Sequence, residues 1–216
     1  AMIAQEPVRV SQVVRHAIQF NARHWRSQTM SSDLMPQAVG DLFHLLDQRG
    51  IDYVLVGGIA LLSYVEGRNT EDIDLIVALP SLSKLPEITL TSQDIYFARG
   101  QFQGLQIDFL LTSNPLFEQV RRRHTAVQRF DEWKITTATV EGLLLLKLYA
   151  LPSLYREGNF ARVGLYENDV ATLLYYYQPD QEAILRELAS HLSASDLAEV
   201  RAILAEIGQR ILRFHR

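Results

Sequence analysis

Two aspartates, Asp72 and Asp74, stand two positions apart in the run EDIDLIV. Side chains of a strand alternate between its faces, so both carboxylates are predicted to point one way while Ile73 and Leu75 point into a core. Two like charges this close repel each other, and a fold tolerates them where a positive group, most often a metal ion, lies between them. The pair therefore indicates a metal site, although such acids can also simply keep an edge strand soluble.

A phosphate-binding turn is predicted just upstream of this pair. The strand-like run YVLV at residues 53–56 leads directly into Gly57 and Gly58 and then into the apolar run IALL. At the start of a helix the first amide N–H groups have no partner within the helix, and both these groups and the helix dipole favour an anion. We therefore expect Gly57 and Gly58 to bind nucleotide phosphate, whereas a glycine pair by itself would indicate only a tight turn.

Asp108 is the third candidate carboxylate, in the run LQIDFLL at residues 105–111. An acidic residue is unfavourable in an otherwise apolar strand and needs a partner, which is either a metal ion or a local salt bridge. Three carboxylates beside a glycine turn suit two-metal nucleotidyl transfer, because Mg²⁺ prefers carboxylate and phosphate oxygens. In this scheme Asp72 and Asp74 bind the metal ions that hold the triphosphate, while Asp108 serves the attacking hydroxyl and helps to remove its proton.

Four further residues are candidates for the same site. Lys147 lies among leucines in LLLLKLYAL, so its ammonium group must reach water or meet an anion. We expect that anion to be the nucleotide phosphates. The alternative is an ion pair with Asp169, and both contacts are possible together if Asp169 orients the lysine. Arg68 and Thr70 flank the turn before the first two aspartates, where Thr70 can hydrogen-bond the turn and Arg68 can bind phosphate or an acidic partner.

Composition limits the functions that are open to the chain. Its 216 residues are 48% apolar and 21% charged, the net charge is −4, and there is no cysteine. The absence of cysteine excludes disulfides, thiolate catalysis and cysteine-based zinc sites. The mild negative charge argues against a generally basic surface that coats nucleic acid, but it leaves room for local basic patches. Without an apolar run of membrane-spanning length or a signal peptide, we expect a soluble, cytoplasmic protein without a membrane partner.

The periodicity of apolar residues predicts an α/β (α+β type) protein in three parts. These are an N-terminal helical extension at residues 1–30, a core with a mixed β-sheet flanked by helices at 31–138, and a helical C-terminal region at 139–216. We expect residues 78–92 to form a loop with at most a short helix, residues 100–104 a turn, and Pro152 the end of a helix. The expected strands are 53–56, 72–75, 95–98, 105–111, 127–130 and 133–137, and the expected helices are 34–48, 59–62, 115–123, 143–151, 162–177, 180–191 and 195–214.

A glycine pair, a helix and then the motif R-x-T-x-D-I-D-L together resemble the signature of the DNA polymerase β-like nucleotidyltransferase superfamily. More narrowly, GGIALLSYVEGRNTEDIDL resembles the AbiEii/AbiGii-type nucleotidyltransferase toxins, bacterial components of toxin–antitoxin and phage-defence systems. The resemblance covers roughly residues 40 to 178. It implies a nucleotidyltransferase core with the catalytic residues Asp72, Asp74, Asp108, Lys147 and Asp169. The metal ligands would be Asp72, Asp74 and Asp108. The nucleotide would be bound by Gly57, Gly58, Arg68, Thr70 and Lys147.

The same resemblance implies an activity and partners. The enzyme would need Mg²⁺ in a two-metal site and take an NTP as co-substrate. It would move the NMP of this NTP to an acceptor hydroxyl of RNA, with a tRNA 3′ end as the leading acceptor. Its protein partner would be a cognate antitoxin. In the family, the region between the lysine and the last aspartate often carries an arginine, and a basic residue often stands directly before that aspartate. Here Arg156 and Arg162 are the candidates for the arginine, whereas Asn168 stands in the place of the basic residue.

Two alternatives remain open from the sequence. One is a small-molecule, antibiotic-type nucleotidyltransferase, which an acidic acceptor pocket would favour, whereas a basic groove leading to Asp108 would favour RNA. The other is a non-catalytic nucleotide-binding regulatory module, and the three intact aspartates speak against it.

Overall fold

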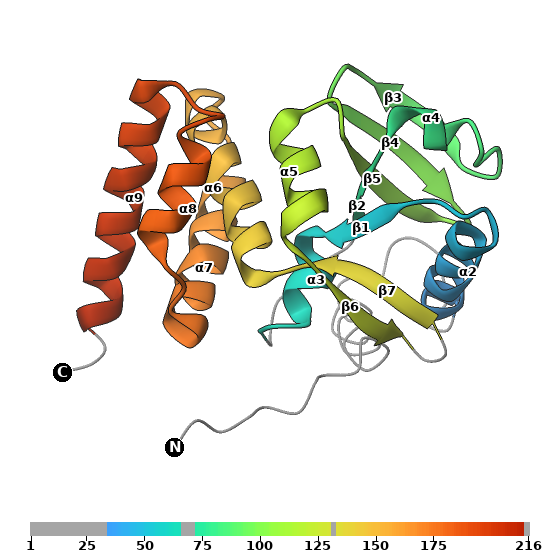
Figure 1. The fold of residues 1–216 in the computed structure, drawn as a ribbon, viewed down its shortest axis with the longest axis horizontal. Coiled ribbons are helices and arrows are strands. Elements are labelled where there is room, and N and C mark those ends of the chain that lie inside the picture. The colour runs from blue at the N-terminus through green and yellow to red at the C-terminus, as the bar shows by residue number, and fades with distance from the viewer. Residues whose placement is uncertain (1–33, 66–71, 131–132, 214–216) are drawn as a thin grey trace. The chain divides into compact units, whose positions relative to one another are not determined.

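The computed structural model describes residues 34–65, 72–130 and 133–213. The expected helical extension at residues 1–30, and both Arg68 and Thr70, lie outside these described residues. The chain divides into two compact units, Ala1–Ala138 and Thr139–Arg216 (Figure 1). None of the described helices combines the length and the apolar run that crossing a lipid bilayer requires.

The first unit is built on a mixed seven-stranded sheet with the strand order β3-β4-β5-β2-β1-β7-β6. Strand β2 runs parallel to β5, and β1 runs parallel to β7, while the other neighbours are antiparallel. The mixed sheet confirms the predicted fold class. The strands are β1 (Tyr53–Val56), β2 (Ile73–Val77), β3 (Thr89–Gln93), β4 (Phe97–Phe102), β5 (Leu105–Leu111), β6 (Thr125–Phe130) and β7 (Trp133–Ala138).

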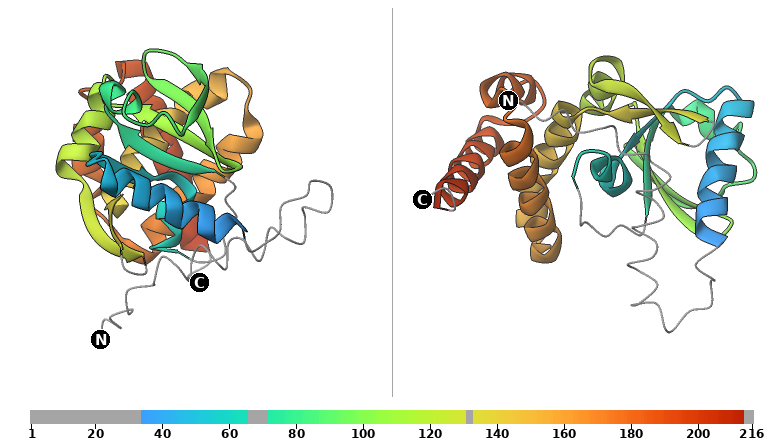
Figure 2. Two further views of the ribbon diagram at one scale, coloured as in Figure 1. Left: turned by 90° about the vertical axis from the view of Figure 1, so that its right-hand side faces the viewer. Right: turned by 90° about the horizontal axis from the view of Figure 1, so that it is seen from below.

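Helices cover both faces of this sheet (Figures 1 and 2). Phe43 of α2 (Leu34–Gln48) packs against Tyr53 of β1 with 5.8 Å between ring centroids. On the other face, Phe117 of α5 (Pro115–Arg123) packs edge-on against Phe97 of β4 at 5.5 Å. The register places Tyr53 on the same face of the sheet as Ile73 and Val77, and Phe97 on the opposite face. The short helices α3 (Gly57–Leu62) and α4 (Leu79–Leu82) complete this unit.

Apolar alternation explains the central strands. In β5 the side chains of Leu105, Ile107, Phe109 and Leu111 are buried, whereas the alternate positions are partly exposed. A shift of one residue would turn the apolar set to the other face, so burial on the α2 face fixes the register. The same alternation therefore decides which face carries Asp108.

The structure corrects the prediction for residues 78–104. Strand β3 occupies Thr89–Gln93, where a loop was expected, and β4 runs on to Phe102, so that Gly100 lies within a strand instead of in a turn. All five residues of β3 are exposed, so it has no apolar face to mark it in the sequence. The turn is formed by Gln103 and Gly104, which both have positive φ angles, 47° and 79°. Two such residues match the twist of a tight hairpin.

The second unit contains four helices: α6 (Val140–Arg156), α7 (Phe160–Tyr177), α8 (Gln181–Leu188) and α9 (Ala194–Arg213). The expectation that Pro152 ends a helix was wrong, because α6 continues through it to Arg156. A proline removes one helical hydrogen bond, but Leu151 and Leu154 on either side are buried, and this packing stabilises the last turn. The chain then reverses at Gly158, whose φ angle is +68°.

Candidate functional site

Three charged side chains form a row across the sheet on the α5 face. Asp74 of β2 is the register partner of Asp108 of β5, and Asp108 is the register partner of Arg99 of β4. Register partners on neighbouring strands point to the same face. The sheet therefore brings together two aspartates that are 34 positions apart in the sequence.

The place of Asp72 differs in part from the prediction. It lies directly before β2, which begins at Ile73, so the strand alternation applies to Asp74 alone. The charge of Asp72 nevertheless acts on the same row. The pKa of Arg99 is raised above its ordinary value, first by the hydrogen bond to Asp108 and that carboxylate's charge, and then by the charges of Asp72 and Asp74. The charges of all three predicted carboxylates therefore act on the guanidinium group of Arg99.

Arg99 holds Asp108 with both ends of its fork. Its Nε donates to Oδ1 of Asp108 at 2.7 Å, and its Nη2 donates to Oδ2 at 3.2 Å. The Arg99 side chain is 46% exposed and that of Asp108 is 21% exposed, so the pair lies at the surface of the sheet. This pair is the local salt bridge that was the alternative interpretation of Asp108.

Sequence reasoning missed Arg99, although a signal for it exists. The two-residue turn at Gln103 and Gly104 places Arg99 and Asp108 at equal distances from the turn on the two strands of a hairpin. With the turn expected at residues 100–104, this pairing could not be read from the sequence. An opposite charge directly across an antiparallel pair is a stabilising arrangement, and it becomes visible once the turn is placed correctly.

Gly57 lies directly against the carboxylate of Asp74. Its φ angle is +68°, and a Cβ atom added there would lie 2.1 Å from Oδ2 of Asp74. Any other residue at this position would be strained and would push the carboxylate away. The glycine turn and Asp74 thus meet in space, as expected for a site that holds a metal ion and a phosphate together.

The start of α3 offers amide groups to an anion, but only from a short helix. Val56 at its N-cap position has no polar side chain to bond the first turn. The helix has six residues, so its dipole adds little, and the expectation for Gly57 and Gly58 rests on their backbone N–H groups. Phosphate binding here stays a prediction.

The carboxylates fit a hard cation by their chemistry. Asp74 and Asp108 place carboxylate oxygens on adjacent strands, and oxygen ligands of this kind suit Mg²⁺. Among the described residues, however, no group of three or more His, Cys, Asp or Glu side chains is already gathered to hold a metal ion. Asp108 is turned to Arg99 instead. Residues Asp72, Asp74 and Asp108 therefore remain the predicted metal ligands, with Asp108 held by a counterion.

The second unit buries a lysine–aspartate pair. Nζ of Lys147 on α6 lies 2.9 Å from Oδ2 of Asp169 on α7, and the two side chains are only 6% and 2% exposed. The same Nζ lies 4.0 Å from the centre of the Tyr166 ring, a cation–π contact. The structure thus forms the ion pair considered from the sequence, and a contact of Lys147 with nucleotide phosphate stays a prediction.

The two candidate arginines, Arg156 and Arg162, have other surroundings in the described part of the helical unit. Nη1 of Arg156 donates to Oδ1 of Asp196 at 2.6 Å, and Arg162 is exposed on α7. Which of the two serves the site, as the resemblance implies for one arginine, stays a prediction.

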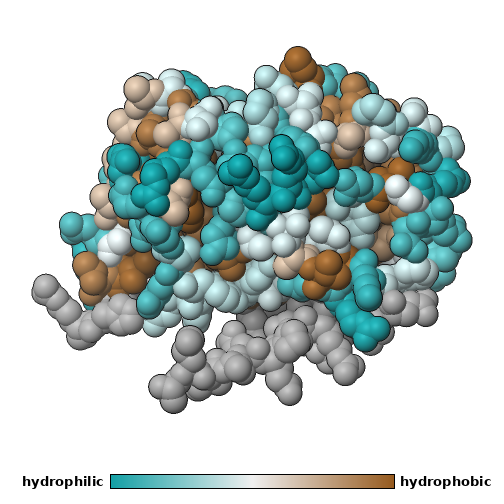
Figure 3. Space-filling model, viewed as in Figure 1, coloured by the Kyte–Doolittle hydropathy of each residue, from teal (hydrophilic) through white to brown (hydrophobic). Residues whose placement is uncertain are grey.

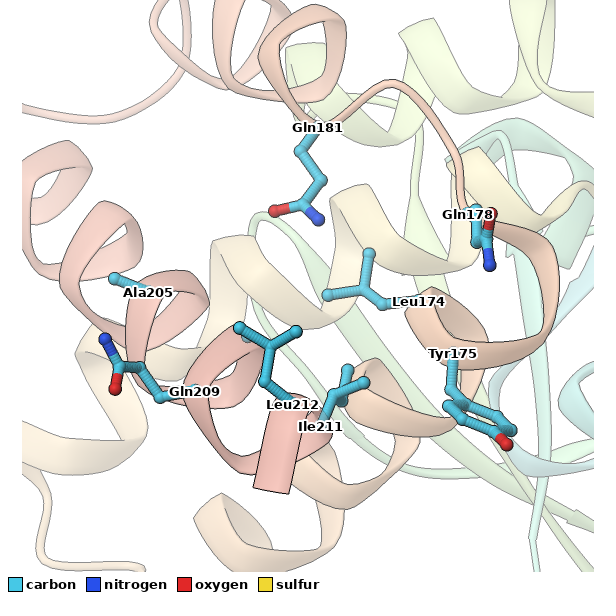
Figure 4. Close-up of a pocket in the computed structure, with 9 residues that line it drawn as sticks. Leu174, Tyr175, Gln178, Gln181, Ala205, Gln209, Ile211 and Leu212 are labelled. Carbon is cyan, nitrogen blue, oxygen red and sulfur yellow. The ribbon is translucent and has the colours of Figure 1, made fainter. Parts of the chain in front are cut away.

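An open groove of about 430 Å³ lies within the helical unit, between the ends of α7, α8 and α9 (Figure 4). Apolar side chains also gather on the surface over the C-terminal end of α9 (Figure 3), where Leu212 is 67% exposed. The groove is lined by Leu174, Tyr175, Gln178, Gln181, Ala205, Gly208, Gln209, Ile211 and Leu212. Without a charged side chain, this lining is unsuited to a metal ion or a triphosphate, so the carboxylate row is the better candidate site.

Comparison with known proteins identifies the fold. The solution structure of the antibiotic-resistance factor ANT(2'')-Ia is similar with a TM-score of 0.50 and 12% identity, over 83% of this chain and 95% of that chain. An antigenic nucleotidyltransferase-like protein from Paracoccidioides brasiliensis gives a TM-score of 0.48 and 18% identity, over 79% and 93% of the two chains. A crystal structure of ANT(2'')-Ia in complex with adenylyl-2''-tobramycin gives 0.44 and 12%, over 76% and 95%.

At such low identity the likeness concerns the fold alone. No protein-family model matches the chain, and no curated protein matches its sequence. The likeness to ANT(2'')-Ia shows a nucleotidyltransferase-like fold.

Proposed function

We propose that this chain, which has a nucleotidyltransferase-like fold, is an enzyme that transfers the NMP of an NTP to an acceptor hydroxyl. The observation that carries the proposal is the register of β2 and β5, which sets Asp74 beside Asp108 while the Asp74 carboxylate lies against the glycine turn at Gly57. Carboxylates beside backbone amides suit a nucleoside triphosphate, because the carboxylates bind the cation that neutralises the phosphates and the amides bind the phosphates directly.

The predicted carboxylates and the glycine turn each have a part in the proposed reaction. Asp72, Asp74 and Asp108 would hold Mg²⁺, which when bound neutralises the triphosphate and stabilises the attacking and leaving oxygens. The backbone N–H groups of Gly57 and Gly58 orient the phosphates. The acceptor oxygen forms a bond to the α-phosphorus, the bond from this phosphorus to the oxygen that bridges to the β-phosphate breaks, and pyrophosphate leaves. The carboxylate of Asp108 accepts the proton of the acceptor hydroxyl.

RNA is the acceptor that we favour. The cation next to Asp108 is Arg99, which is half exposed, and a guanidinium group at the acceptor side favours a phosphate-bearing acceptor over a cationic amino sugar. By the resemblance to AbiEii/AbiGii-type toxins, the acceptor is a tRNA 3′ end, the outcome is inhibition of translation, and the protein partner is a cognate antitoxin. A small-molecule acceptor is the second candidate, because the similar fold of ANT(2'')-Ia belongs to an antibiotic-resistance factor.

The acceptor can be identified by incubating the protein and Mg²⁺ with each α-labelled NTP in turn. Total RNA is the acceptor in one set of reactions, and a panel of hydroxylated small molecules that includes amino sugars is the acceptor in the other. We expect label in RNA of tRNA size with one preferred NTP. Label in amino sugars alone would replace RNA by the second candidate, and a periodate-treated RNA, which lacks free 3′ hydroxyls, serves as the matched control.

A further inference from the structure

The bidentate pair of Arg99 and Asp108 adds only modestly to the stability of its hairpin. Both side chains lie at the surface of the sheet, and exposed ion pairs contribute little to stability. The apolar side chains of β5 on its other face already fix the register of the hairpin. The pair therefore calls for a functional explanation.

Arg99 occupies the same atoms that a metal ion would take. Its Nε and Nη2 bond the two different oxygens of the Asp108 carboxylate, at 2.7 and 3.2 Å. A divalent cation at Asp108 would both compete for these oxygens and repel the guanidinium charge. The two cations are therefore alternatives at this carboxylate.

We propose that Arg99 is a positioning residue that exchanges with the metal ion at Asp108, holding this carboxylate while the site is empty and releasing it when the cation binds. This proposal rests on the proposed function, because it assigns Asp108 to the metal site. It also accounts for the lack of a ready three-carboxylate cluster in the described part of the chain. Binding of the metal then requires that the pair opens first.

The released guanidinium lies on the acceptor side of the row. In the order β4-β5-β2-β1, Arg99 stands on the side of Asp108 that faces away from Asp74 and Gly57. Neighbouring strands are about 4.8 Å apart, so Arg99 lies within side-chain reach of a group that meets Asp108 from that side. A guanidinium fork binds phosphate with the geometry that it uses for carboxylate. The freed Arg99 would thus position a phosphate of the acceptor.

Metal binding to the free protein tests the exchange without any turnover. Mn²⁺, a spectroscopic substitute for Mg²⁺, is titrated into the wild type, Arg99→Gln and Arg99→Lys, and bound Mn²⁺ is measured by electron paramagnetic resonance. Loss of the competing cation is expected to tighten Mn²⁺ binding by about threefold to tenfold in Arg99→Gln, with Arg99→Lys in between because it keeps the charge but not the fork. Unchanged or weaker binding by Arg99→Gln would overturn the proposal.

Arg49→Gln is the matched control. Arg49 also joins a surface carboxylate, that of Glu87, in the same unit but outside the row. We expect it to bind Mn²⁺ like the wild type, and thermal unfolding of each variant verifies that it is folded. A damaged fold does not tighten metal binding, so the expected gain cannot arise from a merely structural role.

The transfer reaction gives the second readout. For Arg99→Gln we expect KM for the acceptor to rise by about tenfold while kcat and KM for the NTP change little, since one phosphate contact is lost. An unchanged KM for the acceptor would overturn the positioning role. Absence of transfer by the wild type would instead be a failure of the proposed function, and the Mn²⁺ titration would still decide the exchange.

Discussion

Replacing Asp74 with Asn is expected to lower kcat for nucleotidyl transfer by about 10³-fold or more, because removing one group that stabilises the charge of the transition state has effects of this size. Asp74 combines two roles in the structure. It faces Asp108 across the β2–β5 pair, and its Oδ2 lies against Gly57. Asn keeps the shape of the side chain but removes the charge that holds the cation. The measurement is label transfer from an α-labelled NTP under saturating conditions.

A matched control separates loss of chemistry from loss of fold. Asp52→Asn removes a carboxylate of the same unit that pairs with Arg121 at the surface, at 2.7 Å. Its transfer rate should equal that of the wild type, and circular dichroism should show both variants folded. If folded Asp74→Asn transferred label at the wild-type rate, Asp74 would have no place in the site.

Replacing Lys147 with Met is expected to lower the free energy of unfolding by about 3–5 kcal/mol, the range for breaking a buried ion pair from one side. The ammonium group lies 2.9 Å from the carboxylate of Asp169, which is 2% exposed and has little water to replace the lost partner. Met fills a similar volume, so a cavity contributes little. Urea unfolding followed by the helical signal at 222 nm measures the change.

The double variant Lys147→Met, Asp169→Leu should recover most of this loss, because it removes both charges and leaves an apolar contact. Arg156→Met is the control on the same helix. Arg156 pairs with Asp196 at the surface, so we expect its unfolding midpoint to stay close to that of the wild type. Equal stability of Lys147→Met and the wild type would show that the buried pair does not stabilise the helical unit.

Local patterns in the sequence predicted the parts of the fold that carry a strong apolar signal. The strand Leu105–Leu111 and the helices Leu34–Gln48 and Pro115–Arg123 have the predicted bounds, because alternation or caps mark them. Asn114, for example, caps α5 by accepting from the amides of Leu116 and Phe117. The sequence placed Asp74 and Asp108 in strands, and the parallel register of β2 and β5 in the structure pairs them.

Features that depend on distant contacts were not predictable in this way. Strand β3 has no buried face, and Gly100 lies within β4 although glycine usually indicates a turn. A Cβ at Gly100 would lie 2.8 Å from Cγ2 of Ile88, a contact that only the fold reveals. The misplaced turn also hid Arg99, so three carboxylates of the candidate site could be predicted from the sequence, but the cation that holds one of them could not.

Comparing α-labelled with γ-labelled NTP tests the central claim most directly. Wild-type protein is incubated with Mg²⁺, either nucleotide, and either total RNA or the panel of hydroxylated small molecules, and label is followed in the acceptor and in released pyrophosphate. A nucleotidyltransferase leaves the α-label on the acceptor and releases the γ-label as pyrophosphate, and we expect this result. Appearance of the γ-label on the acceptor, or of no label on any acceptor tested, would contradict the assignment of nucleotidyl transfer to this protein.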